Sequence, residues 1–153
     1  MIFIDTPNLQ SSGIRVGVPL LNFQELMSIL AGDQRPVGCN CYVPDREDRQ
    51  AFYGQLERMG LHVNRVSPGK SVDGRLIFDM LDGAITNRYD IATLCSGDGD
   101  YIRVVERVKQ MGKTVWIATF SGSVSAGLGA AADKLIKLDD VIDRIRMERR
   151  QAV

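Results

Sequence analysis

Acidic residues recur in this chain where a short apolar run gives way to a turn. Asp5 follows such a run at the start of the chain, Asp98 and Asp100 follow another in the glycine-rich segment 96–101, and Asp73 comes just after the turn at residues 68–70. Carboxylates are costly to gather in a fold unless a positive charge lies among them. In an open α/β sheet, such turns meet at one edge. The pattern therefore predicts a divalent-metal site.

Each of these acids also has a purely structural interpretation. Asp5 could be an ordinary turn residue. Asp100 fits the N-cap of the helix that follows it, whereas Asp98 lies in the loop with no comparable local role, so Asp98 is the stronger ligand candidate. Asp73 lies in the first turn of a predicted helix, where it either interacts with the helix dipole or meets the other acids.

We expect all protein ligands of the metal to be oxygen atoms. His62, the only histidine, lies in a predicted strand away from every acidic turn, and Cys39, Cys41 and Cys95 lack the Cys-x-x-Cys spacing of zinc sites. Carboxylate oxygens suit hard cations. We therefore expect Mg²⁺ or Mn²⁺ rather than zinc.

Length and composition limit the fold and function classes that are possible for this chain. A chain of 153 residues, 44% hydrophobic and 25% charged, has the size of one globular domain. Its 19 basic and 19 acidic residues cancel, so any nucleic-acid footprint must be a local patch. The three cysteines favour a reducing cytoplasm. No cleaved signal is expected, and no segment approaches the ~18 apolar residues that a membrane span requires.

Strand-like runs alternate with helical patterns along the chain, which predicts an α/β fold with a mainly parallel sheet of five to six strands and helices on both faces. Helices are expected to begin at Asn22, after Asp45, at Ser71 and near Asp100. Two segments, 10–19 and 121–130, are expected to be loops, and 143–150 a short basic helix. The strands are expected near 1–5, 37–43, 61–66, 90–95, 113–119 and 134–138.

Several motifs together resemble the NYN domain, in the LabA-like branch of the PIN-like nucleases. The resemblance rests on Phe3-Ile4-Asp5-Thr6-Pro7-Asn8-Leu9, Lys70-Ser71-Val72-Asp73 with Asp79 further along, Tyr89-Asp90, Ser96-Gly97-Asp98-Gly99-Asp100-Tyr101 and 131–138. It covers residues 1–139 and leaves 140–153 as a C-terminal basic helix or tail. The combination of the first and the fourth motif is fairly specific, whereas either alone is weak.

The resemblance implies a Rossmann-like, PIN-type three-layer sandwich that binds Mg²⁺ or Mn²⁺ and hydrolyses phosphodiester bonds, most often in RNA. Asp5, Asp73 and Asp98 would form the acidic centre and ligate the metal. Asp100 would be an accessory ligand or make a water-mediated contact in the catalytic site, and Asn8 and Ser96 would be polar supports at the substrate site. The chain departs from many relatives at Thr6-Pro7, where the fixed φ of proline could reshape the turn that holds Asn8.

Substrate contacts are expected to position RNA rather than to read its sequence. Lys70 and Arg103 flank the acidic turns and could hold a phosphodiester, and Ser123 lies in a serine-rich segment that could donate to phosphate oxygens. Tyr101 and Phe120 are the only aromatic residues expected near this edge, so strong base specificity is not predicted.

Two rival functions remain open from the sequence. One is a non-catalytic module that holds RNA or a partner protein at the same edge, with a homodimer as one form. The other is a small-molecule phosphohydrolase or receiver-like phosphoacceptor, ranked last because the segment after the fifth strand, Phe120-Ser121-Gly122, offers no lysine.

Overall fold

The computed structural model describes residues 1–147, and the remaining six residues lie outside the described part of the chain. Its centre is one parallel sheet in the order β3-β2-β1-β4-β5-β6. The chain builds outward from β1 to β3 and then returns to place β4 beside β1, so the strand order reverses between these two strands. In such sheets ligands bind outside the carboxyl ends of the strands at this point. The strands are β1 (Ile2–Asp5), β2 (Cys39–Pro44), β3 (His62–Val66), β4 (Ile91–Cys95), β5 (Thr114–Thr119) and β6 (Lys134–Lys137).

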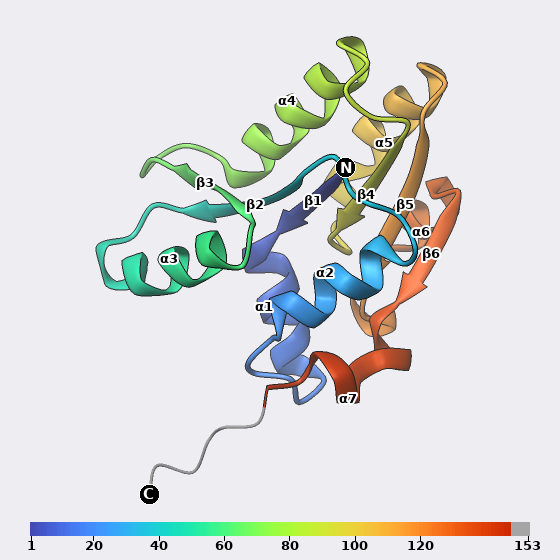
Figure 1. The fold of residues 1–153 in the computed structure, drawn as a ribbon. Helices are drawn as coiled ribbons and strands as arrows, with labels where there is room; N and C mark the ends of the chain where they lie inside the picture. Colours follow the sequence, from blue (N-terminus) through green and yellow to red (C-terminus); the bar gives the residue numbers. More distant parts are fainter. Residues whose placement is uncertain (148–153) are drawn as a thin grey trace, which may run out of the picture.

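Helices cover both faces of the sheet (Figure 1). One apolar cluster joins the sheet to α1 (Thr6–Arg15), α2 (Phe23–Ala31), α3 (Gln50–Arg58) and α7 (Ile142–Ile145). The other joins it to α4 (Val72–Ile85), α5 (Ile102–Gln110) and α6 (Ala126–Ala131). The predicted three-layer α/β fold is confirmed, and all six strands fall where the sequence predicts them. Within residues 1–147, no helix is long and apolar enough to cross a membrane.

Two predicted helix starts are confirmed by their caps. The Asn22 side chain accepts a hydrogen bond from the Glu25 amide at 3.1 Å, and Ser71 accepts one from the Gly74 amide at 3.0 Å. Each side chain satisfies an amide that the first helical turn leaves without a backbone partner. The cap at Ser71 fixes the start of α4 and therefore the position of Asp73 in its first turn.

The prediction of a loop at 10–19 was wrong for most of that segment, because α1 runs to Arg15. Asp5 caps this helix and Pro7 occupies its first turn, where a missing amide costs nothing. The small residues are needed for close packing: a Cβ on Gly13 would lie 2.8 Å from the carbonyl oxygen of Val18. The serine and glycine that suggest a loop here are packing residues of a helix.

The prediction of a loop at 121–130 was also wrong in part. A short 3₁₀ turn, η3 (Ser121–Ser123), is followed by α6, whose N-cap Ser125 accepts from the Leu128 amide at 3.2 Å. Leu128 is fully buried, which anchors the helix to the core. The predicted basic helix at 143–150 lies partly outside the described residues, and its described part is the short α7, held by buried Ile145.

Candidate metal centre

Asp5 lies at the carboxyl end of β1 and is 3% exposed. Its carboxylate accepts hydrogen bonds from the Asn8 amide at 3.2 Å, the Ser96 hydroxyl at 3.2 Å and the Tyr101 hydroxyl at 3.0 Å. Burial raises the pKa of Asp5 above its ordinary value, and the nearby charge of Asp73 adds to that rise, while the three donors oppose it. Asp5 is therefore a buried, well-bonded acid beneath the surface of the site.

Tyr101 joins two of the predicted acids. Its hydroxyl oxygen lies 3.0 Å from Asp5 Oδ2 and 3.1 Å from Asp73 Oδ1. A phenol has one proton to donate, so the Tyr101 hydroxyl shares it between the two carboxylate oxygens. Burial and the two carboxylates raise the pKa of Tyr101 far above its ordinary value, so it stays a neutral phenol.

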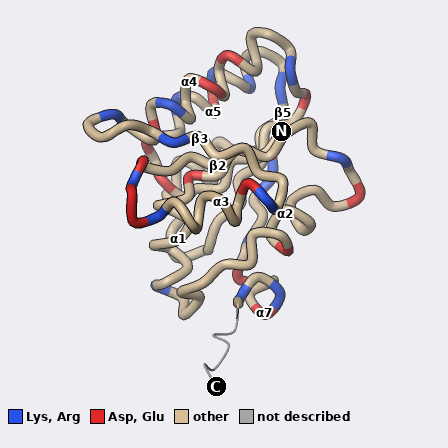
Figure 2. The backbone as a smooth tube through the Cα atoms, turned by 60° about the vertical axis from the view of Figure 1, so that its left-hand side comes forward, with Lys and Arg blue, Asp and Glu red and all other residues tan. Residues whose placement is uncertain are grey.

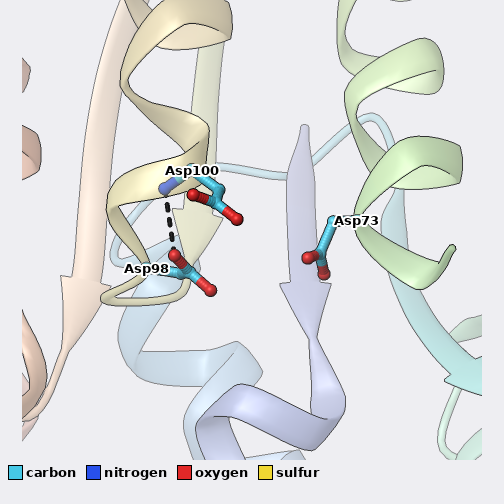
Figure 3. A group of neighbouring side chains, drawn as sticks. All are labelled: Asp73, Asp98 and Asp100. Carbon is cyan, nitrogen blue, oxygen red and sulfur yellow. Dashed lines mark hydrogen bonds between the residues drawn. The ribbon is translucent and has the colours of Figure 1, made fainter.

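Asp73, Asp98 and Asp100 form a cluster in which one carboxylate oxygen from each lies within 4.8 Å of the others. Asp73 projects from the start of α4, and the other two project from the turn after β4, so the carboxylates face one another across the end of β1 (Figure 3). Asp73 and Asp98 are half-buried and Asp100 is exposed. This acidic cluster is open to solvent on one side and can admit a ligand.

The structure groups these acids differently from the sequence expectation. The expected metal ligands were Asp5, Asp73 and Asp98, with Asp100 as an accessory residue. Asp100 lies with Asp73 and Asp98 in the acidic cluster, whereas Asp5 lies outside it and is linked to Asp73 through the Tyr101 hydroxyl.

The expected N-cap at Asp100 was wrong. Asp98 caps the 3₁₀ turn η2 (Gly99–Tyr101), and its Oδ1 accepts from the Asp100 amide at 2.9 Å. This bond brings the two acids into the same turn and leaves Oδ2 of Asp98 for another partner. The local role that the sequence assigned to Asp100 therefore belongs to Asp98, which also remains in the cluster.

Asn8 and Ser96 hold the acidic turns together. The Asn8 side-chain oxygen accepts from the Gly97 amide at 3.2 Å and ties α1 to the turn after β4. Ser96 is fully buried; it donates to Asp5 and accepts from the Asp98 amide at 3.2 Å. Pro7 is accommodated in the first turn of α1 without displacing Asn8 from these contacts.

Gly97 is required by the close approach of a second segment. A Cβ on this residue would lie 2.1 Å from the carbonyl oxygen of Ser123, and the Ser125 amide donates to the Gly97 carbonyl at 2.9 Å. The serine-rich segment 121–125 is thereby fastened against the turn that carries Asp98. Ser123, expected to contact substrate, is half-buried beside that turn.

The other expected substrate contacts, Lys70 and Arg103, lie on the surface. Lys70 is exposed in the loop before α4 and lines a cleft with Ser67 and Ser71, and Arg103 is exposed in the first turn of α5. Tyr101 and Phe120, expected as stacking residues, are both fully buried. They cannot stack on a base, and the role of Tyr101 in joining Asp5 to Asp73 is one that the sequence analysis missed.

The donor set fits a hard divalent cation. The acidic cluster offers carboxylate oxygens from Asp73, Asp98 and Asp100, the ligand type that Mg²⁺ and Mn²⁺ prefer. A cation there would also relieve the repulsion among three carboxylates held within one small space. The residues present therefore fit a metal of this class.

Two known proteins are similar to this chain, one in sequence and one in fold. The chain is 25% identical over 111 residues to the low amplitude and bright protein LabA of Synechococcus elongatus, a match that covers 63% of this chain and 59% of that protein. The chain thus spans less than two thirds of this relative's length. Its fold matches the crystal structure of a protein of unknown function from Vibrio parahaemolyticus, with a TM-score of 0.80, 21% identity, and coverage of 94% of this chain and 93% of the other.

The NYN domain family matches residues 1–139. That range contains all six strands, the acidic cluster, Asp5 and Tyr101. The family is PIN-like and related to nucleases. With nearly the whole chain matched, the protein belongs to the NYN domain family.

Proposed function

We propose that this protein is a metal-dependent ribonuclease that hydrolyses phosphodiester bonds of RNA with Mg²⁺ or Mn²⁺ held by Asp73, Asp98 and Asp100. One observation carries the proposal: three carboxylates from two distant parts of the chain meet at the carboxyl edge of the sheet, in a chain of a nuclease-related family. Asp98 also caps a turn and Asp73 also accepts from Tyr101, but neither role requires Asp73 to face Asp98 and Asp100.

The chain's own residues have distinct roles in this proposal. The acidic cluster binds the ion, which supplies Lewis-acid polarisation of the scissile phosphate when bound. Asp5, buried beneath the cluster, orients Asp73 through Tyr101 and Asp98 through Ser96. Lys70 and Arg103 flank the cluster and hold the phosphodiester backbone, which positions the strand without reading its sequence.

Three unpaired cysteines favour a reducing compartment, and we propose that the protein acts in the cytoplasm. Cys41 and Cys95 are fully buried and Cys39 is half-buried, and no disulfide joins them. Burial raises the pKa of Cys41 to about 12. These thiols are consequently packing groups rather than nucleophiles.

A cleavage time course tests the proposal. Single-stranded RNA of mixed sequence is incubated with the parent protein and Mn²⁺, Mg²⁺ or EDTA, beside the Asp98→Asn and Glu106→Gln variants. Asparagine keeps the cap at position 98 while removing one ligand charge, and Glu106 is an exposed acid on α5 outside the cluster. We expect metal-dependent cleavage by the parent and by Glu106→Gln but none by Asp98→Asn.

Two results contradict the nuclease proposal. Cleavage by Asp98→Asn at the parent rate would trace the activity to a contaminant or to another site. RNA that stays intact with every metal, yet is bound in EDTA, would instead support the non-catalytic binding module.

A further inference from the structure

A cleft opens at the carboxyl edge of the sheet, on the face that α1 and α3 cover. Its volume is about 130 Å³. Thr6 in its wall directly follows Asp5 in the chain, so the cleft adjoins the network beneath the acidic cluster. Its walls come from the first turns of α1, the end of β2 and the start of α3, and are formed by Thr6, Pro7, Gln10, Val43, Pro44, Arg46, Arg49, Phe52 and Tyr53.

Four ring side chains, those of Pro7, Pro44, Phe52 and Tyr53, line this cleft. The rings of Pro7 and Pro44 are rigid in themselves. The Tyr53 hydroxyl donates to the Pro44 carbonyl, and this hydrogen bond fixes the orientation of the Tyr53 ring. Phe52 is half-buried and packs edge-on against Phe23, with ring centroids 6.0 Å apart. Flat apolar walls suit a planar ring, which stacks on or edges against them.

A buried polar atom lies beside these walls without a partner. Thr6 is 1% exposed, and its hydroxyl forms no hydrogen bond. Buried polar groups nearly always have a partner, so one without a partner calls for an explanation. The Gln10 amide in the same wall carries both donors and an acceptor. The Thr6 hydroxyl and the Gln10 amide are therefore available to form hydrogen bonds with polar atoms at the edge of a ring in the cleft.

Two arginines, Arg46 and Arg49, line the rim of the cleft, in a segment that also carries Asp45, Glu47 and Asp48. Arg46 is held by Asp48 through two hydrogen bonds of 3.0 and 2.9 Å, whereas Arg49 is exposed on the same rim. These residues lie between β2 and α3, a segment in which Figure 2 shows basic and acidic residues together. Arg49 is thus the rim cation best placed to meet a phosphate.

We propose that this cleft binds one nucleotide of the RNA strand next to the scissile phosphate. The base enters between the proline and phenylalanine walls, with Thr6 and Gln10 at its edge, and the phosphate of the same nucleotide meets Arg49. The volume is below that of pockets for whole small ligands, which run from about 300 to 1,000 Å³, so it suits a single ring attached to a longer chain. The choice of RNA rests on the proposed function.

The test measures binding without cleavage. Fluorescent single-stranded RNA is titrated with the parent protein in EDTA, at several salt concentrations between 50 and 200 mM. We expect Arg49→Ala to weaken binding about five- to tenfold at the lowest salt and to reduce the slope of log K against log salt by about 0.7, the value for one phosphate contact on a single strand. Arg58→Ala is the matched control, because this exposed arginine lies at the other end of α3.

A second variant tests the contact with the base separately from the contact with the phosphate. Thr6→Val keeps the shape of the side chain and removes its hydroxyl. We expect it to weaken binding about threefold or more through the lost hydrogen bond, with the salt slope unchanged, because a base contact releases no counterions. Its thermal unfolding curve shows whether the fold is retained, and Arg49→Ala, an exposed change, tests the proposal independently.

The outcomes separate this inference from the proposed activity. Equal affinities and salt slopes for Arg49→Ala and Arg58→Ala would overturn the nucleotide subsite, as would a lack of RNA binding by the parent. The parent protein could bind RNA in a way that depends on Arg49 and Thr6 and yet cleave no RNA. That result would support the nucleotide subsite and contradict only the nuclease proposal.

Discussion

Replacing Tyr101 with phenylalanine removes the single hydroxyl that contacts both Asp5 and Asp73. The Phe ring still fills the fully buried space, so the change isolates the hydrogen bonds. Hydrogen bonds to charged groups contribute about 1.5–3 kcal/mol. Because the proton is shared between two acceptors, we expect a total loss near the middle of that range, about 2 kcal/mol at pH 7 in EDTA.

The loss should depend on pH, because Tyr101 is one of the donors that lower the pKa of Asp5. Without it, the pKa of Asp5 in the folded protein rises further above its unfolded value of about 3.9. An acid whose pKa is raised on folding contributes stability below the unfolded pKa and loses it as pH rises through the folded pKa. The destabilisation by Tyr101→Phe should therefore grow from pH 4 to pH 7.

Urea unfolding in EDTA at several pH values measures this effect, with Tyr89→Phe as the matched control. Tyr89 is also buried, but its hydroxyl donates to a neutral acceptor, the Met80 carbonyl, at 2.6 Å. Its loss should cost about 0.5–1.5 kcal/mol with little change between pH 4 and pH 7. If Tyr101→Phe costs no more than Tyr89→Phe, or its cost shrinks toward pH 7, the account of the Asp5–Tyr101–Asp73 network is refuted.

Three further changes probe the same region. Asp5→Asn should make the metal-free protein more stable at pH 7, with the gain shrinking toward pH 4, because it removes a buried acid with a raised pKa; thermal unfolding in EDTA checks this, and a stability loss at pH 7 would contradict it. Gly97→Ala should cost about 1–3 kcal/mol through overpacking, since the added Cβ would lie 2.1 Å from the Ser123 carbonyl oxygen; an unchanged urea midpoint would show that the turn gives way freely. Millimolar Mn²⁺ should raise the melting temperature of the parent but not of Asp98→Asn, because a ligand stabilises only the state that binds it; equal shifts in both would place the ion elsewhere.

The sheet could be predicted because its signals are local. Each strand is a short apolar run bounded by turn residues, and the caps at Asn22 and Ser71 mark helix starts that the structure reproduces. The helix at Thr6–Arg15 could not be predicted from composition. Its Ser12 and Gly13 are small because neighbouring backbone lies close to them, and that closeness exists only in the folded chain.

The acidic site was predictable in outline but not in detail. Turns at the carboxyl ends of parallel strands must meet, which brings Asp73 and Asp98 together. The position of Asp100 depends on the 3₁₀ turn that Asp98 caps, and the contact of Tyr101 with two acids depends on where that turn directs its ring. The cleft at Thr6 and Arg49 likewise lies between α1 and the start of α3. Nothing in the sequences of these two segments predicts that they lie close together.

The most direct measurement of the central claim is Mn²⁺ binding followed by electron paramagnetic resonance, in which free Mn²⁺ gives the signal and bound Mn²⁺ does not. The parent and Glu106→Gln proteins should each remove Mn²⁺ from solution, and Asp98→Asn should bind it much more weakly while keeping the same fold by circular dichroism. Mn²⁺ binding that is absent from the parent, or equal in the parent and Asp98→Asn, would contradict the assignment of Asp73, Asp98 and Asp100 as a metal centre.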